Sequence, residues 1–149
     1  MSRHIPAAWR KLIAERAFHL CEYCLIHADD TAWTCPVDHV ISLKHGGAHH
    51  PDNLAQACLI CNRDKGADLG TILKSGEFAR LFNPRKDKWW EHFELKNGLI
   101  LPKTDIGEAT VKVLGFNHPD RVAERQWLIE QGRYPHPDAL RFIQSNFEP

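Results

Sequence analysis

The chain repeats one cysteine spacing, first in Cys21-Glu22-Tyr23-Cys24 and again in Cys58-Leu59-Ile60-Cys61. A C-x2-C turn, here called a knuckle, places two thiolates on one side of a metal ion, and two knuckles complete a tetrahedral site. The 33 residues between Cys24 and Cys58 exceed the usual spacing of a zinc ribbon. They must therefore fold on themselves, as a strand-loop-strand unit would.

The two knuckles favour zinc over disulfide bonds. No window of the sequence approaches the roughly 18 consecutive apolar residues of a membrane span, and the first ten residues lack the apolar region of a signal peptide. We therefore expect a cytoplasmic protein without a membrane partner, whose thiols stay reduced. Four sulfur ligands leave no open coordination position, so a zinc ion held by Cys21, Cys24, Cys58 and Cys61 is expected to be structural.

Two other interpretations of the cysteines stay open, buried free thiols and a redox-active pair. Thioredoxin-like redox chemistry needs one C-x2-C at a strand-to-helix junction, so two matched knuckles fit zinc better. The fifth cysteine, Cys35, is expected to be a small buried apolar side chain.

Composition bounds the class of protein. A length of 149 residues, with 43% hydrophobic and 26% charged residues, suits one domain with a small appendage. Nineteen basic residues balance nineteen acidic ones, so any nucleic-acid binding must come from a local patch rather than from net charge. No pattern in the sequence indicates an oligomeric state.

Hydrophobic periodicity and turn residues predict an ordered series of elements around the knuckles. The apolar stripe of a helix over residues 6–20 is expected to pack in the core; its members are Trp9, Leu12, Ile13, Ala17 and Leu20. The expected elements that follow are a strand over 33–41 interrupted by Pro36, a polar loop over 42–52, a return strand over 53–57 and a helix over 59–68.

The second half of the chain predicts one hairpin and three helices. Residues 71–88 show little periodicity, whereas Asn97-Gly98 is a strong signal for a two-residue hairpin turn. We expect its strands at 89–95 and 99–101, with Trp89 and Trp90 in the core. Helices are expected at 105–114, at 119–131 with Asn117 as N-cap, and at 137–145.

Three polar residues between and after the knuckles carry the chemistry of phosphodiester hydrolysis. That reaction needs a base to deprotonate water and a cation to stabilise charge on the phosphate. His39 supplies an imidazole, while Asp38 and Asn62 supply oxygens that suit magnesium or manganese. Adjacent strand residues point to opposite faces, so Asp38 and His39 can serve one phosphate only where the backbone bends.

Basic and histidine side chains nearby have both a binding and a plain surface interpretation. Arg63 and Lys65 follow Asn62 on the expected helix, and Lys65 lies one turn along the same face, where it could hold a phosphate. A solvated helix surface explains them equally well. A basic run beside two tryptophans could grip a DNA backbone; its members are Arg80, Arg85, Lys86 and Lys88. The histidines of the polar loop could bind metal or phosphate, but we expect them to be exposed to solvent; they are His45, His49 and His50.

The whole pattern is more specific than any of its parts. It runs from the first knuckle through Asp38-His39, Gly46-Gly47 and Asn53-Leu54 to the second knuckle, and ends in Asn62-x2-Lys65-Gly66. This pattern resembles the HNH endonuclease family, in the variant where asparagine replaces the last histidine, over about residues 10–70.

The resemblance implies an α+β fold with a ββα-metal (His-Me finger) core and a four-cysteine zinc site. The N-terminal helix would precede this core, and a hairpin and C-terminal helices would follow it. It also implies a nuclease core over residues 1–70 and a C-terminal extension over 71–149. His39 would be the general base, and Asn53 would tie the loop and orient that histidine. Asp38 and Asn62 would hold the catalytic cation. Arg63 and Lys65 are candidates for contact with nucleic acid from their place on the expected helix, not from the resemblance.

The leading hypothesis is therefore a metal-dependent DNA endonuclease with structural Zn²⁺ and a catalytic Mg²⁺ or Mn²⁺. One metal and one base per active site would cut one strand, so the protein would nick DNA or cut both strands after pairing. With asparagine at position 62 the cation has one charged ligand, which predicts weak binding without DNA. The alternatives are a non-catalytic, zinc-stapled module that binds nucleic acid or protein, and a redox protein that uses the knuckles.

Overall fold

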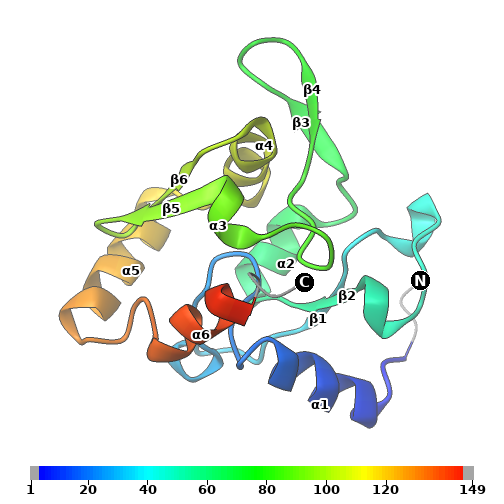
Figure 1. The fold of residues 1–149 in the computed structure, drawn as a ribbon, viewed down its shortest axis with the longest axis horizontal. Helices are drawn as coiled ribbons and strands as arrows, with labels where there is room; N and C mark the ends of the chain where they lie inside the picture. Colours follow the sequence, from blue (N-terminus) through cyan, green and yellow to red (C-terminus); the bar gives the residue numbers. More distant parts are fainter. Residues whose placement is uncertain (1–3, 146–149) are drawn as a thin grey trace.

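Short antiparallel hairpins alternate with helices in the computed structural model, which describes residues 4–145 (Figure 1). The helix α1 (Ala7–Arg16) precedes the first knuckle. The hairpin of β1 (Val37–His39) and β2 (Leu54–Gln56) follows, and α2 (Leu59–Lys65) begins inside the second knuckle. The register pairs Val37 with Gln56 and His39 with Leu54. The predicted α+β class and the β-β-α order are therefore confirmed.

The remaining elements form the second half of the chain. They are two further hairpins, β3 (Gly70–Ile72) with β4 (Phe78–Arg80) and β5 (Phe93–Lys96) with β6 (Leu99–Pro102), and the helices α3 (Trp89–His92), α4 (Asp105–Leu114), α5 (Pro119–Glu130) and α6 (Pro137–Ser145). Three 3-10 turns lie in the first half, namely η1 (Ala28–Asp30), η2 (Leu43–His45) and η3 (Pro51–Asn53). No helix in this described part of the chain is long and apolar enough to cross a membrane.

Helix α1 ends earlier than the predicted boundary at residue 20. Phe18 and His19 take positive φ angles of 52° and 61°, which break the helix and turn the chain into the first knuckle. Ile13, Ala17 and Leu20 are buried as the stripe predicts. Leu12 is instead 46% exposed, because it lies about 100° round the helix from the buried Ile13.

Other differences from the sequence prediction lie in the second half. The hairpin β3–β4 forms in a segment without clear periodicity and projects from the rest of the fold (Figure 1). Trp89–His92 form a helical turn rather than the start of a strand. Helix α5 is capped by the His118 ring, not by Asn117, whose side chain instead bonds the backbone of Ile100 at 2.9 Å.

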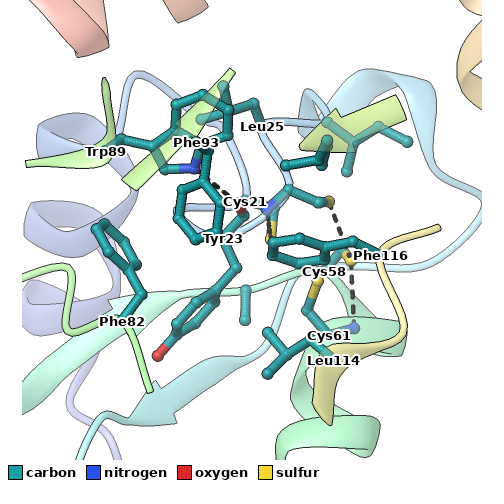
Figure 2. Close-up of a cluster of buried hydrophobic side chains, with 14 of the residues drawn as sticks. Cys21, Tyr23, Leu25, Cys58, Cys61, Phe82, Trp89, Phe93, Leu114 and Phe116 are labelled. Atoms are coloured by element: carbon teal, nitrogen blue, oxygen red, sulfur yellow. Dashed lines mark hydrogen bonds between the residues drawn. The ribbon is translucent and has the colours of Figure 1, made fainter. Parts of the chain in front are cut away.

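One hydrophobic cluster contains residues from both halves of the chain. The four knuckle cysteines and Tyr23 pack with aromatic side chains from the second half (Figure 2); these are Phe82, Trp89, Phe93 and Phe116. The predicted burial of Trp89 is confirmed, while Trp90 is only partly buried. Cys35 is half-buried against the same cluster. The division into a core over 1–70 and an extension over 71–149 stays a prediction.

Three consecutive residues of the first knuckle each receive a polar contact from the second half. Arg85 forms an ion pair with the buried carboxylate of Glu22, whose other oxygen accepts the Gln56 N–H at 2.8 Å. The Trp89 Nε1–H donates to the Tyr23 carbonyl at 2.9 Å, and the Tyr134 hydroxyl donates to the Cys24 carbonyl at 2.7 Å. The second half therefore fixes the knuckle backbone directly.

Replacing Arg85 by methionine should lower the free energy of unfolding by about 3–5 kcal/mol, because Glu22 would become an unpaired buried carboxylate. Burial already raises the pKa of Glu22, and Arg85 opposes that rise. Without Arg85 the pKa rises further, so Glu22 becomes protonated at acidic pH and the loss should be smaller there than at pH 8. Urea unfolding at pH 5 and pH 8 measures both effects. The exposed neighbour Lys86→Met is the control, and an equal loss in both variants would contradict the assignment.

Candidate functional site

Asp38, His39 and Asn62 line one open hollow on the surface. Asp38 and His39 lie at the end of β1, and Asn62 lies in the first half of α2. The hairpin brings β1 beside β2, and the knuckle that follows β2 turns the chain into α2. Asp38 and His39 both belong to the three-residue strand β1, which ends at His39.

The Asp38 carboxylate is buried and held by two donors. The Tyr23 hydroxyl donates to Oδ2 at 2.7 Å, and the Lys65 ammonium lies 3.2 Å from Oδ1 and 3.1 Å from Oδ2. Desolvation raises the pKa of Asp38, while Lys65 and Tyr23 act to lower it. Burial and the neighbouring Asp38 charge raise the pKa of Tyr23 well above its ordinary value. The carboxylate therefore has a fixed orientation and a compensated charge.

Lys65 and Arg63, predicted to contact nucleic acid, lie in different environments. Lys65 is buried, and its ammonium also donates to the His39 carbonyl at 3.1 Å. Arg63 is exposed and bonds its neighbour Asp64 at 3.0 Å. Lys65 therefore balances the charge of the buried Asp38 carboxylate. Of these two residues, only Arg63 has its charged group in the solvent.

A chain of two histidines orients the His39 ring. Nε2 of His39 lies 3.1 Å from Nδ1 of His49, and Nε2 of His49 lies 3.0 Å from the His4 carbonyl. A carbonyl oxygen can only accept, so His49 donates through Nε2. Neutral His49 then accepts at Nδ1 from the Nε2–H of His39. In this tautomer the basic nitrogen of His39 is Nδ1.

Asn53 ties the loop between β1 and β2. Its Oδ1 accepts the Ile41 N–H at 2.9 Å, and its Nδ2 donates to the carbonyls of Ile41 and Ala48 at 2.8 Å each. Gly47 lies inside the closed loop, where an added Cβ would meet the Ile41 carbonyl oxygen at 1.7 Å. The loop that carries His49 is therefore closed by an amide side chain and by a position that only glycine fits.

Asn62 contributes its side-chain amide to the hollow. Its backbone N–H donates to the Cys58 carbonyl as part of α2. Among the described residues 4–145, the Asn62 side chain has no hydrogen bond, so its oxygen can face a ligand in the hollow. A buried carboxylate, an amide and an imidazole thus meet at one place.

The four knuckle cysteines form a buried cluster whose sulfur atoms all lie within 4.8 Å of one another. Cys24 Sγ and Cys58 Sγ are 3.7 Å apart, too far for a disulfide. A tetrahedron with Zn–S distances of about 2.3 Å has edges of about 3.8 Å. Each knuckle also donates one backbone N–H to its own sulfur, from Cys24 to Cys21 and from Cys61 to Cys58, at 3.4 Å. The geometry of the cluster fits zinc.

A buried arginine from α5 gives independent support for negative charge on the cluster. Arg121 Nη2 lies 3.1 Å from Cys61 Sγ and 3.9 Å from Cys58 Sγ, and Nη1 donates to the Leu114 carbonyl. Among residues 4–145 no carboxylate forms an ion pair with this guanidinium. Burial would lower the pKa of Arg121, and negative charge on Cys61 and Cys24 more than reverses that effect. Because Nη2 of this buried cation faces the sulfur atoms, the contact favours thiolates, the form that binds a metal.

Four of these contributions are not evident from the sequence. The pattern marks Tyr23 only as a knuckle residue, Lys65 as a phosphate-binding or surface cation, and Arg121 as part of a helix, because each partner lies far away in the sequence. His49 stands out only as a member of a histidine-rich loop. Two members of the basic run are paired with carboxylates: Arg80 with Asp87 at 2.8 Å, and Arg85 with Glu22.

Comparison with known proteins gives one match. The model of the HNH endonuclease family matches residues 21–68, which include both knuckles and the residues Asp38, His39 and Asn62 of the hollow. A four-cysteine cluster of this kind is typical of zinc-bound members. No curated protein and no solved structure matches the chain.

Replacing Gly47 by alanine should destabilise the protein by about 1–3 kcal/mol, because the new Cβ overlaps the Ile41 carbonyl. Gly46→Asn is the matched control. Gly46 has a φ of 83° and no atom within 4 Å of its added Cβ, so asparagine should cost at most about 1 kcal/mol there. Thermal unfolding compares the two variants, and equal melting temperatures would contradict the close approach at Gly47.

Proposed function

Because residues 21–68 form an HNH endonuclease domain, we propose that this protein hydrolyses DNA phosphodiester bonds, with His39 as the general base. The observation that carries the proposal is the meeting of Asp38, His39 and Asn62 at one open hollow within the matched residues. An open hollow suits a bulky, extended substrate such as a nucleic-acid strand. The polar groups that meet there match the parts that phosphodiester hydrolysis needs.

The base is oriented before substrate arrives. The chain from His39 through His49 to the His4 carbonyl favours the tautomer with a proton on Nε2 of His39. The lone pair on Nδ1 can then take a proton from water, and His49 can share the positive charge that results. Asn53 holds the loop that carries His49. Asn53 and His49 are therefore positioning residues in this proposal, and His39 is the catalytic base.

Asp38 and Asn62 are proposed to hold a divalent cation, Mg²⁺ or Mn²⁺, since carboxylate and amide oxygens suit these ions. When bound, such a cation stabilises negative charge on the phosphate and on the leaving oxygen. Tyr23 and Lys65 keep the Asp38 carboxylate oriented. Since Lys65 already balances the Asp38 charge, the cation should bind weakly until a DNA phosphate adds negative charge.

The four-cysteine cluster is proposed to hold a structural Zn²⁺. Four sulfur ligands leave no position for substrate, and the cluster lies in the hydrophobic core. Arg121 offsets part of the charge of four thiolates around one zinc ion. With zinc bound, both knuckles would keep the conformation that positions β1, β2 and α2 relative to one another.

One observation favours a second candidate, a zinc-stapled module that binds DNA without cutting it. Asp38 is buried, and Lys65 already pairs with its carboxylate. If this ion pair never opens, the hollow lacks a charged metal ligand. This module would bind DNA in the same way with magnesium or with EDTA, so cleavage assays separate the two functions.

Supercoiled-plasmid cleavage with Mg²⁺, Mn²⁺ or EDTA tests the proposed function. We expect cleavage only with a divalent ion, and a rate at least about 100-fold lower for His39→Ala, because a general base contributes that much or more. Open-circle product would indicate nicking, and linear product would indicate cutting of both strands. Divalent-dependent cleavage that survives His39→Ala would disprove the role of His39, and no cleavage by zinc-loaded wild type would favour the binding module.

A paired comparison in the same assay tests the histidine chain. His49→Ala should give a smaller loss than His39→Ala, because it removes orientation but not the base. His50→Asn is the control: His50 is exposed and caps η3 through the Asp52 N–H, and asparagine keeps that cap. Equal rates for His49→Ala and wild type would remove His49 from the proposal.

Zinc retention tests the role of Arg121. Arg121→Leu removes a charge-assisted hydrogen bond to the thiolates, so a chelator should extract zinc roughly tenfold faster or more. Arg125→Leu is the control, since Arg125 is a buried guanidinium of the same helix that bonds the carbonyls of Gly98 and Phe116. Equal acceleration in both variants would reduce Arg121 to a packing role, and zinc-free wild-type protein would overturn the structural zinc itself.

A further inference from the structure

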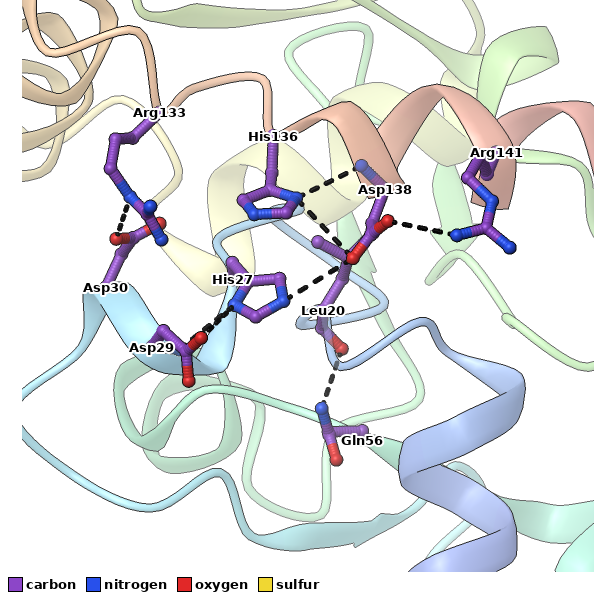
Figure 3. Close-up of polar contacts among 9 residues, drawn as sticks. All are labelled: Leu20, His27, Asp29, Asp30, Gln56, Arg133, His136, Asp138 and Arg141. Atoms are coloured by element: carbon purple, nitrogen blue, oxygen red, sulfur yellow. Dashed lines mark hydrogen bonds and ion pairs between the residues drawn. The ribbon is translucent and has the colours of Figure 1, made fainter.

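A second group of metal-binding side chains lies away from the hollow, where α6 meets η1 (Figure 3). His27 follows the first knuckle and caps η1, whereas His136 and Asp138 lie at the start of α6. One ligand atom from each residue lies within 4.8 Å of the other two. Two segments more than a hundred residues apart in the sequence thus bring two imidazoles and a carboxylate together.

Capping accounts for each of these residues within its own segment, since His136 caps α6 and His27 caps η1, but not for the meeting of the two segments. The tripeptide His-Pro-Asp occurs at 50–52, 118–120 and 136–138, and in each copy the ring Nδ1 accepts the aspartate N–H at 3.0–3.2 Å. In the first two copies the carboxylate is at least 90% exposed. In the third copy the Asp138 carboxylate is 27% exposed, because His27 packs against it. The cap of α6 does not require His27, and the cap of η1 does not require Asp138.

The distances in the third copy are close to those of a metal site. The Asp138 Oδ2 atom lies 3.7 Å from His27 Nε2 and 3.6 Å from His136 Nδ1. Ligands about 2.1 Å from a tetrahedral ion are about 3.4 Å apart. The two rings are stacked, with centroids 4.1 Å apart and planes 22° apart, so one ring must turn before both lone pairs meet at an ion. His136 can turn by giving up its cap, which is weaker than a bond to a metal.

Charged side chains next to the three residues orient them for binding an ion. Arg141 lies 3.3 Å from Asp138 Oδ1, which leaves Oδ2 toward the imidazoles. Nδ1 of His27 accepts the Asp29 N–H at 3.1 Å. If Nε2 binds an ion, the ring proton moves to Nδ1, this cap is lost, and Nδ1–H can donate to the Asp29 carboxylate 3.7 Å away. Burial and the nearby His136 lower the pKa of His27.

We propose that His27, His136 and Asp138 bind a second zinc-class divalent ion, which ties α6 to the first knuckle. Two imidazoles and one carboxylate suit zinc, cobalt or nickel rather than magnesium. The docking of this segment is already set by two contacts, Arg133 with Asp30 at 2.6 Å and Tyr134 with the Cys24 carbonyl at 2.7 Å. The ion would add a third tether between the C-terminal helix and the knuckle, and this role does not depend on nuclease activity.

Zinc titration of untagged protein whose cysteine cluster is already filled tests this site. We expect a second equivalent of zinc and a higher melting temperature in its presence. His136→Asn, which keeps the cap, and Asp138→Asn should each bind the first equivalent and lose the second. The controls His118→Asn and Asp120→Asn make the same changes in an exposed copy of the motif, and both should keep two equivalents.

Three outcomes would overturn the second site. Wild type could bind one equivalent only, or Asp138→Asn could keep the second. The second equivalent could also vanish in His39→Ala and persist in Asp138→Asn, which would place the ion in the hollow beside Asn62. Retention of the first equivalent shows that each variant is folded, so a loss of the second cannot be attributed to unfolding.

Discussion

The first knuckle is the constraint on which the rest of the structure depends. Its cysteines belong to the buried sulfur cluster, while its two inner residues face in other directions. Tyr23 donates its hydroxyl to Asp38 at the candidate active site, and Glu22 binds Gln56 of β2 and Arg85 of the second half. A change in the conformation of this one turn would therefore reach the sulfur cluster, the hollow and the packing of the second half together.

Charge compensation inside the protein follows from that arrangement. Buried acidic groups each face a basic group from a distant segment, as Asp38 faces Lys65 and Glu22 faces Arg85. The sulfur cluster faces Arg121 in the same way. An unpaired charge in such a place costs several kcal/mol, so the contacts of Arg85 and Arg121 fix how the second half meets the knuckles. The chain has no net charge overall, and its buried acidic groups are paired with specific basic groups inside the protein.

Sequence reasoning was most successful where the relevant spacing is local. The cysteine knuckles, the β-β-α order, the hairpin at Asn97-Gly98 and α4 were predicted because turn residues and periodicity report local conformation. It failed where packing overrides local preference. Leu12 is exposed on α1, Trp89 starts a helical turn, and β3–β4 forms without a periodic signal. The N-cap of α5 was misplaced because Asn117 binds β6 instead.

The sequence by itself determined the inventory of chemical groups and their order: two C-x2-C knuckles, then Asp38-His39 between them and Asn62 directly after. Ligand spacing of this kind involves residues that are close together in the sequence, so it is recognisable without knowledge of the fold. Only the tertiary structure decided the partners: Tyr23 and Lys65 on Asp38, His49 on His39, Arg121 on Cys61, and His27 against His136. Most of these pairs join residues far apart in the chain, and hydrogen bonds and burial select them only once the core has formed.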